Sequence, residues 1–448
     1  MPPPAETAPP HDIAPTRRAS VHREWRFVGF GFLLALYSSF GQTFFVSLFA
    51  DPIRAEFGLS HGRWGLIYSL GTLASGLTMM RAGALVDTMS LPRLTLWLTG
   101  GLTLACGLFA VAPAAIVLIP AVYLVRLFGQ GMLSHTAQTT MARYYDRGRG
   151  RAMSLSSLGH AAGEAILPTL GVALILAVGW REAWVRVALV VLVTLPALSW
   201  LLLRGFGARH ADHVERAAAR ERADDALTAA AAATVTATTT DRASDADSAA
   251  PAAPRGDRTR GQAIADPGFW MLILCVMAPG FIVTGIFFHQ NHLVAVQGWT
   301  KPAFAATFGV FAFTQLPAAL IAGPLVDRYG AVRLVPFYLL PMAAGLGVLA
   351  ATPDFAAAWV FMGLTGLTAG AAGPVVGAMW AERYGVRHLG AIRGFVTAIL
   401  VIATALSPAS MGVLIDAGVP LAAMIAAAAV YATFAGGLAL VALRRPAP

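Results

Sequence analysis

Charge and cysteine are both scarce in this sequence. Charged residues make up 12% of its 448 positions and hydrophobic residues 57%, whereas a soluble globular domain averages about 25% charged residues. The composition therefore excludes an ordinary soluble domain. The two cysteines, Cys106 and Cys275, both lie in apolar runs, so each is predicted to be a buried core residue and not half of a disulfide. Two isolated thiols are also too few for a metal site, and no metal is expected.

Motifs of several other protein classes are missing as well. There is no glycine-rich loop followed by Lys and Ser or Thr, which ATP-driven proteins use, and no nucleophile elbow or zinc signature. Lys301 is the only lysine, and the net charge of +9 comes from arginines beside apolar segments. That pattern is typical of orientation in a membrane and not of nucleic-acid binding. We therefore expect a protein that is not an enzyme, has no cofactor and has no nucleic-acid partner.

Long apolar runs fill most of the chain. Each is close to the ~20 residues that an α-helix needs to cross a ~30 Å hydrocarbon core, and helices satisfy all their backbone groups internally. A large soluble helical protein is the alternative, but its helices would be amphipathic. The sequence thus predicts an all-α integral membrane protein with twelve transmembrane helices, at residues 27–49, 62–82, 92–112, 115–141, 153–177, 183–203, 268–291, 303–325, 332–351, 356–379, 390–414 and 420–443.

The polar stretches divide the chain into four parts. Residues 1–26 are predicted to be a disordered cytoplasmic tail, 27–203 and 267–448 two six-helix bundles, and 204–266 a flexible cytoplasmic linker, because that stretch lacks large apolar residues. Its part from 210 to 227 could form a short charged helix, and a regulatory domain is the alternative for the whole linker. Arginines concentrate in the connections on one side of the predicted membrane, which places both termini in the cytoplasm.

One short connection occurs twice, 240 residues apart. The second copy is Gly323-Pro-Leu-Val-Asp-Arg-Tyr-Gly-Ala-Val-Arg333, and the first is Gly83-Ala-Leu-Val-Asp-Thr-Met-Ser-Leu-Pro-Arg93. The same spacing relates Arg143-Tyr144 to Arg383-Tyr384 and Pro168 to Pro408. Matches at one offset along half the chain indicate an internal duplication.

The repeated connection resembles the cytoplasmic loop motif of the major facilitator superfamily, a family of secondary transporters. The second copy is complete, whereas the first has Thr88 in place of Arg and Ser90 in place of Gly. The resemblance implies two pseudo-symmetric six-helix bundles around a central cavity, with alternating access by rocking of the halves, in a bacterial-type inner membrane. It assigns a conformational role to Gly83, Asp87, Arg93, Gly323, Asp327, Arg328, Gly330 and Arg333.

Two charged residues lie near the middle of predicted membrane helices. Arg126 and Glu164 are each about 11 residues from a helix end, or roughly 16 Å deep, and charges at that depth are functional candidates. Arg126, with Gln130 one turn later, is predicted to bind substrate; in the resembling family an arginine followed by close-spaced glycines on the fourth helix is linked to proton coupling or anion binding. Glu164 and His160, four residues apart, are predicted to couple protons. The alternatives are that Arg126 only pairs with Glu164, and that His160 only packs.

Other polar residues in apolar runs are weaker candidates. Tyr37, Gln42 and Gln315 are predicted to line the substrate site, although isolated polar residues often bond only to a neighbouring helix. His289 and Gln290, at the outer end of the seventh segment, are predicted to belong to an outer gate. An interfacial cap is the equal alternative for these two.

These observations together predict a transporter for a small organic anion such as a monocarboxylate, moved with protons by alternating access. A drug/proton efflux antiporter is the main alternative, and a membrane sensor that moves no substrate is a third. The expected partners are the substrate, protons and the lipid bilayer. The protein is expected to be a monomer driven by the proton gradient.

Overall fold

The computed structural model describes residues 17–145, 148–211, 214–215, 222 and 257–444, and all regular secondary structure in these ranges is helical. The N-terminal half consists of α1 Arg17–Ser38, η1 Ser39–Gly41, α2 Thr43–Val46, η2 Ser47–Phe49, α3 Ala50–Phe57, α4 His61–Ala82, α5 Leu85–Thr88, α6 Leu91–Val111, η3 Ala115–Val117, α7 Leu118–Leu124, η4 Val125–Leu133, α8 Ser134–Tyr144, α9 Arg149–Val178 and α10 Trp180–Leu202. The C-terminal half consists of α12 Arg260–Ala265, α13 Pro267–Phe288, α14 Gln290–Val296, α15 Lys301–Tyr329, α16 Ala331–Leu334, α17 Leu340–Ala351, α18 Ala356–Tyr384, α19 Leu389–Asp416 and α20 Leu421–Arg444.

Each of the twelve predicted segments corresponds to a helix or to a broken helix. Within the described residues, nine helices are long and apolar enough to span a membrane, and a tenth span, Trp25–Phe57, is bent by 44° at its break between Gly41 and Thr43. The remaining two are α4, which has 22 residues but a more polar sequence, and α17, which is 12 residues long and follows an irregular stretch at 335–339. The predicted all-α membrane architecture is therefore confirmed.

The predicted tail and linker differ from the structure at their edges. The helix α1 begins at Arg17 and not at residue 27, because hydropathy marks the bilayer whereas a helix continues until a breaker, and residues 17–26 contain neither Gly nor Pro. The last part of the linker, 257–266, is ordered and contains α12, which has a Thr259–Gln262 capping box. Residues 206–211 are helical, and most of the predicted charged helix at 210–227 lies outside the described residues.

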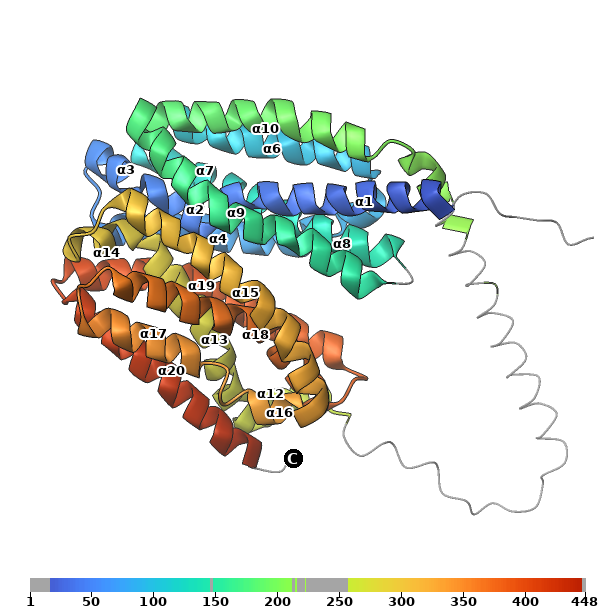
Figure 1. The fold of residues 1–448 in the computed structure, drawn as a ribbon. Coiled ribbons are helices and arrows are strands. Elements are labelled where there is room, and N and C mark those ends of the chain that lie inside the picture. Colours follow the sequence, from blue (N-terminus) through green and yellow to red (C-terminus); the bar gives the residue numbers. More distant parts are fainter. Residues whose placement is uncertain (1–16, 146–147, 212–213, 216–221, 223–256, 445–448) are drawn as a thin grey trace, which may run out of the picture.

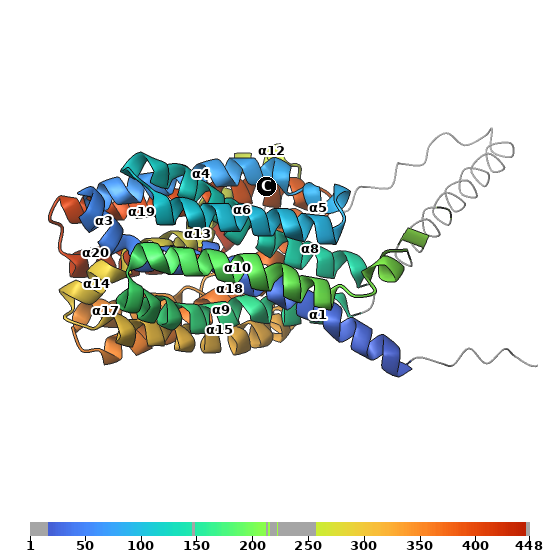
Figure 2. The ribbon, with the colours of Figure 1, turned by 90° about the horizontal axis from the view of Figure 1, so that it is seen from above.

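Figure 1 shows the two halves side by side and diverging toward one end, and Figure 2 shows from above that the long helices of both halves run along the same general direction. We call the end where α10 and α20 finish the inner end, and the opposite end the outer end. At the outer end α4 and α19 are in close contact: a Cβ on Gly65 would lie 2.9 Å from Cα of Ala409, and one on Gly412 would lie 2.9 Å from Cα of Gly62. Such small residues let two membrane helices approach closely.

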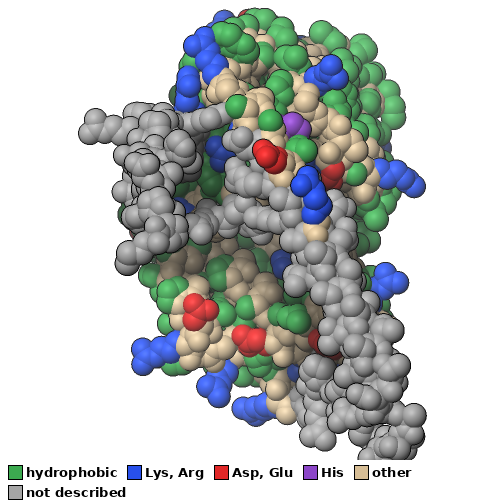
Figure 3. Space-filling view, turned by 90° about the vertical axis from the view of Figure 1, so that its right-hand side faces the viewer, with side chains coloured by type: hydrophobic (Ala, Val, Ile, Leu, Met, Phe, Trp, Pro, Cys, Tyr) green, Lys and Arg blue, Asp and Glu red, His purple; other side chains and the backbone are tan. Residues whose placement is uncertain are grey.

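The inner end carries many of the positive charges. Figure 3 looks onto this end, where Lys and Arg side chains surround both halves. The helices that touch across the halves are chiefly α4 with α19 and α9 with α15. The α4–α19 contact extends inward as far as Gly76, where a Cβ would lie 2.6 Å from Cγ1 of Val401, and the halves diverge toward the inner end (Figure 1).

Candidate functional site

A cavity of about 730 Å³ lies between the halves on the inner side of the α4–α19 contact. It extends from Arg126 in the middle of the fourth span to Asp87 at the inner end, and α4, η4, α8 and α19 form its walls. The polar side chains of its lining are Thr72, Ser75, Asp87, Arg126, Gln130, His135, Thr397 and Thr404. Two of the predicted substrate residues, Arg126 and Gln130, therefore face one cavity, which has the volume of a small-molecule site.

Arg126 lies at the outer, closed end of this cavity and is 5% exposed. Its guanidinium donates to the Gly41 carbonyl at 3.2 Å and to Oγ1 of Thr43 at 3.4 Å. It also lies over the Tyr68 ring, 5.4 Å from the ring centroid, and the Tyr68 hydroxyl donates to Thr43. Its Nε is buried and has no partner among the described residues. Apart from the ring face, the guanidinium is thus held by neutral oxygens only.

The local backbone explains how Arg126 reaches these partners. The stretch Val125–Leu133 is a π-helix, a wider turn that is frequent at functional sites. The first span breaks beside it: Gln42, with ψ 154°, is extended between η1 and α2, so the Gly41 carbonyl faces the guanidinium. Gly129 makes the approach possible, because a Cβ there would lie 2.7 Å from Cα of Gly41.

Glu164 and His160 form a separate pair on α9. Nε2 of His160 lies 3.4 Å from Oε1 of Glu164, and Glu164 is 7% exposed. Neither residue lines the cavity, and no ion pair joins Glu164 to Arg126 among the described residues. The two predicted proton-coupling residues are therefore in contact with each other. The alternative in which Arg126 serves only to pair with Glu164 does not describe this structure.

The three weaker lining candidates lie outside the cavity wall. The Tyr37 hydroxyl bonds to Thr194 of α10, within the N-terminal half. Gln42 is half-buried at the break of the first span, and Gln315 is half-buried on α15. Their polarity alone could not show that the cavity lies on the α4–α19 side. We also did not predict Tyr68, Thr43 and His135 as site residues, because no charge or spacing in the sequence distinguishes them from other polar residues in apolar runs.

The outer end is closed by polar contacts between the halves, which we call the outer closure. Gln290 donates to the Phe44 carbonyl at 2.9 Å and to Oγ of Ser47 at 2.6 Å, and Asn291 donates to the carbonyls of Ser47 and Leu48. The second predicted gate residue, His289, bonds instead to the Pro408 carbonyl within its own half, at 2.9 Å. Gln290 therefore joins the halves, and His289 fixes α13 against α19.

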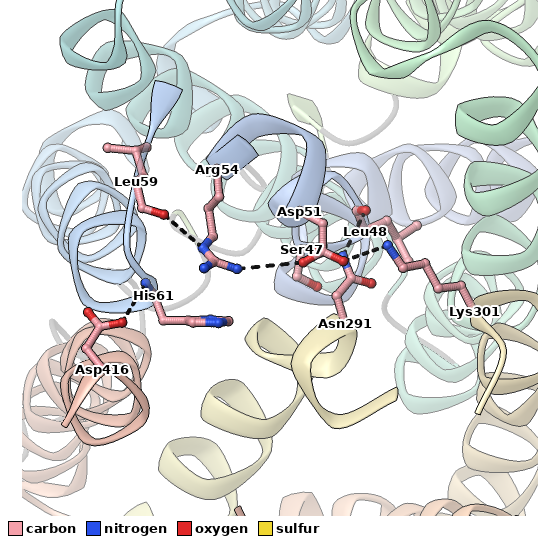
Figure 4. Close-up of polar contacts among 9 residues, drawn as sticks. All are labelled: Ser47, Leu48, Asp51, Arg54, Leu59, His61, Asn291, Lys301 and Asp416. Carbon is pink, nitrogen blue, oxygen red and sulfur yellow. Dashed lines mark hydrogen bonds and ion pairs between the residues drawn. The ribbon is translucent and has the colours of Figure 1, made fainter. Parts of the chain in front are cut away.

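Charged groups complete the outer closure, as Figure 4 shows. Lys301 of α15 lies 2.6 Å from Asp51 of α3, which also pairs with Arg54. Asp416, at the end of α19, accepts from the backbone N–H groups of His61 and Gly62 at 2.9 and 2.8 Å. A carboxylate at the start of α4 is favoured by the partial positive charge of a helix N-terminus. We did not predict a role for Asp51 or Asp416 from the sequence, because each is a charged residue at the end of an apolar run, where solvent-exposed charges are expected.

The two copies of the loop motif are held differently. Asp87 pairs with Arg143 of its own half, whereas Asp327 is exposed and has no ion pair among the described residues. In the second copy Gly330 has φ +81°, and the carboxylate of Glu382 accepts from the N–H groups of Ala331 and Val332 at 2.8 and 3.0 Å. Of the other motif residues, Gly83 lines the cavity, Gly323 is half-buried, and Arg93, Arg328 and Arg333 are exposed.

The counterpart of Arg143, which is Arg383, is bound elsewhere. It lies 3.0 Å from Asp266, the N-cap of α13, and both side chains are buried. Asp266 also accepts from the Tyr384 hydroxyl at 2.8 Å and from the Gly268 N–H. The duplicated arginine thus holds the end of α18 to the start of α13, and it does not bind the loop-motif aspartate.

Comparison with known proteins identifies the family. The model of the Major Facilitator Superfamily matches residues 31–312 and 280–448. Among solved structures, a bacterial homolog of the human lysosomal transporter Spinster matches in its inward-facing unoccupied and occupied conformations, with TM-scores of 0.64 and 0.65. Each shares 14% identity and aligns over 96% of this chain and 98% of the other, so the likeness concerns the fold. No curated protein matches. The chain belongs to the Major Facilitator Superfamily of membrane transporters.

Proposed function

We propose that the protein is a proton-coupled symporter of a small organic anion of the monocarboxylate type. It works by alternating access in a bacterial-type inner membrane, with both termini in the cytoplasm. The proton gradient drives it; it performs no catalysis, holds no cofactor and acts as a monomer. The observation that carries the proposal is Arg126, a buried cation without an acidic partner among the described residues, at the closed end of a cavity.

An anionic substrate would supply the compensating negative charge that Arg126 lacks. Removing a guanidinium from water costs several kcal/mol unless an opposite charge compensates. The Gly41 carbonyl and Thr43 hydroxyl compensate only in part, and Nε keeps an unused donor. A carboxylate could accept from a guanidinium in a two-pronged way. Thr72, Ser75 and Gln130 would supply neutral hydrogen bonds to the remainder of a small substrate.

Proton coupling is assigned to Glu164 with His160. The two side chains are within 3.4 Å of each other, and each has one buried polar atom without a partner among the described residues, Oε2 and Nδ1. A proton on either group would change the hydrogen bonding of both. The helix α9 packs against α1 and against α15 of the other half. Protonation of Glu164 or His160 can therefore influence the contact between the halves.

The test is binding of a panel of organic acids and cationic drugs to purified variants. We expect Arg126→Ala to lose carboxylate binding by at least about a hundredfold, since a charge-assisted pair lost in a buried site costs roughly 3 kcal/mol. Arg126→Lys should rescue poorly, because an ammonium lacks the fork geometry. Arg444→Ala, which removes an exposed arginine at the end of α20, is the matched control and should bind normally. Unchanged carboxylate binding by Arg126→Ala would overturn the anion proposal. Binding of cationic drugs that depends on Glu164 would favour the efflux antiporter.

A further inference from the structure

Two histidines face each other across the halves within the outer closure. His61 begins α4 in the N-terminal half, and His292 lies on α14 in the C-terminal half. Their ring centroids are 4.7 Å apart, with the planes at 67°. His289 lies next to them, with its ring 5.6 Å from that of His61, but its Nε2 bonds to the Pro408 carbonyl. The facing pair thus joins the two halves at the end opposite the cavity mouth.

The charges around this pair are already balanced. From α3, Arg54 and Asp51 lie beside it; Lys301 approaches from α15 and Asp416 from α19. Asp51 is engaged by Arg54 and Lys301, and the carboxylate of Asp416 by two backbone N–H groups. Two cations and two anions sum to zero while the histidines are neutral. Burial and the positive charge of Arg54 both lower the pKa of His292, and the weaker opposite effect of Asp51 does not reverse this.

We propose that His61 and His292 form a proton-binding site on the outer face, and that proton uptake there opens the outer closure. Protonation of both rings would place two new positive charges on rings whose centroids are 4.7 Å apart, beside the positive charge of Arg54. Like charges at such separations repel, and the partly buried position reduces the screening by water. Separation of the halves relieves the repulsion and returns both imidazoles to water.

The direction of the pH effect follows from linkage. A histidine whose pKa is lowered in the closed state regains its ordinary value of about 6.5 when the closure opens. The open state therefore binds more protons, and the closure weakens as the pH falls below about 6.5. At higher pH both rings are neutral in either state, and the contribution of this site to the equilibrium disappears.

Both histidines are well placed to transmit the change. The backbone N–H of His61 is one of the two donors that bind Asp416, so displacement of His61 loosens the α4–α19 contact. His292 directly follows Gln290 and Asn291, whose side chains hold the Phe44–Leu48 segment. Movement of Gln290 and Asn291 would release four hydrogen bonds between the halves together.

The experiment measures the distance between the halves at the outer end without any substrate, so its result does not depend on whether Arg126 binds an anion. Spin labels would be placed at Val111→Cys on α6 and Val296→Cys on α14, which are 70% and 56% exposed. The native Cys106 and Cys275 are fully buried and stay unlabelled. We expect the long-distance population to increase at least about fivefold between about pH 7.5 and about pH 5.

Two variants decide the origin of this response. The double variant His61→Gln/His292→Gln should lose most of it, whereas His388→Gln, which removes a histidine at the inner end, should keep it. Asp416→Asn should raise the long-distance population at both pH values, which shows that the labels report opening. If the double variant shows the same increase of the long-distance population at low pH as the wild type, the proposal is overturned, and the effect belongs to the carboxylates of Asp51 and Asp416. A closure that stays shut at about pH 5 in the wild-type background would overturn it as well.

Discussion

At the scale of single residues, Glu164 and His160 have an arrangement that responds to one proton. Only one oxygen of Glu164 has a partner among the described residues, and that partner is itself titratable. If the carboxylate takes up a proton, it becomes a donor to the imidazole; if the imidazole is protonated, the pair becomes an ion pair. Because neither group lines the cavity, a proton bound here would not block the substrate directly.

Glu164→Gln imitates the protonated carboxyl group and should separate the two activities. We expect exchange of one substrate molecule for another to persist, because exchange needs no net proton movement. Uphill accumulation driven by a pH gradient should fall by at least about tenfold, since the proton can no longer leave the side chain. Proteoliposomes that are assayed for counterflow and for pH-driven uptake would show this. Continued accumulation in Glu164→Gln would transfer the coupling role to His160.

The positions of Arg126 and Glu164 could be predicted because a charge inside an apolar run is costly and rare. Their partners could not be predicted. Arg126 contacts Gly41 and Thr43 because the first span breaks there and the fourth span is π-helical, and neither irregularity follows from hydropathy. Tyr68 reaches Arg126 from a third helix, and its rotation about the helix axis depends on packing between the spans.

At the scale of elements, the broken first span connects the substrate candidate with the outer closure. The segment from Ser39 to Phe49 contains two short 3₁₀-helices and one turn of α-helix. Arg126 contacts this segment at Gly41 and Thr43, and Gln290 contacts it at Phe44 and Ser47. A substrate that draws Arg126 away from Gly41 would therefore act on the same short segment that closes the outer end.

The contact between Gly41 and Gly129 should tolerate no side chain. In Gly129→Ala the new Cβ would lie 2.7 Å from Cα of Gly41, so one backbone must move, at a cost of about 1–3 kcal/mol. Gly107→Ala on α6 meets no atom within 4 Å and serves as the matched control. Thermal unfolding of the two purified variants compares them directly. A midpoint of Gly129→Ala equal to that of Gly107→Ala would show that this contact is not tight.

The start of α13 depends on Asp266. Burial alone would raise the pKa of this carboxyl, but hydrogen bonds from Arg383, Tyr384 and the Gly268 N–H hold it below its usual value. The folded state therefore binds its proton less tightly than the unfolded chain, whose carboxyl has a pKa of about 3.9. Its stabilising contribution is complete above that value and is lost as the pH falls through the lower pKa of the folded state.

Asp266→Asn should accordingly lower the free energy of unfolding by about 3 kcal/mol at neutral pH, because it leaves Arg383 buried without its counterion. The comparison is the exposed Asp354, whose carboxylate accepts from the Ala356 N–H and has no ion pair among the described residues; Asp354→Asn should cost no more than about 1 kcal/mol. Thermal unfolding as a function of pH measures both variants. The Asp266→Asn deficit should shrink below about pH 4; a deficit that stays constant into acid would refute the charge argument.

Helix positions could be predicted well at this scale, and interruptions could not. The α4 and α19 boundaries lie within about two residues of the predicted segments, because apolar length measures the bilayer. The break at Gln42 and the irregular stretch at 335–339 could not be predicted in this way, because each lies inside a run that is apolar over the length of a span. Gly41 and Pro336 lie there, but prolines also lie within the unbroken helices α9 and α10. The same reasoning explains why α1 extends ten residues beyond its predicted start.

At the scale of the whole molecule, the duplication could be predicted from one offset, but the asymmetry between the halves could not. Arg143 and Arg383 are equivalent positions of the duplication. Arg143 nevertheless binds the loop-motif Asp87, whereas Arg383 binds the linker residue Asp266. Asp266 corresponds to Arg26 at the 240-residue spacing, so the copies have different charges where the chain enters each bundle. Asp327 accordingly has no ion pair among the described residues, whereas Asp87 has one.

This asymmetry leads to a prediction about the balance between conformations. In the present structure the outer end is closed by Asp416 across the halves, while Asp327 makes no ion pair among the described residues. We expect Asp327 to contact the start of a helix in the other half when the inner end closes, where helix N-termini favour an anion. The same chemical change at the two sites should therefore act in opposite directions.

Asp416→Asn should decrease the population open at the inner end, and Asp327→Asn should increase it. Each shift should be roughly fivefold or less, since an exposed charged contact contributes up to about 1 kcal/mol. The readout is the rate at which a thiol reagent modifies Thr397→Cys, because Thr397 lines the inner cavity. Asp87→Asn is the matched control: Asp87 is already paired with Arg143 within its own half, so its loss should shift the rate less than that of Asp327. A change in the same direction for Asp416→Asn and Asp327→Asn would contradict the assignment, because two contacts on opposite sides of one equilibrium cannot both stabilise the same state.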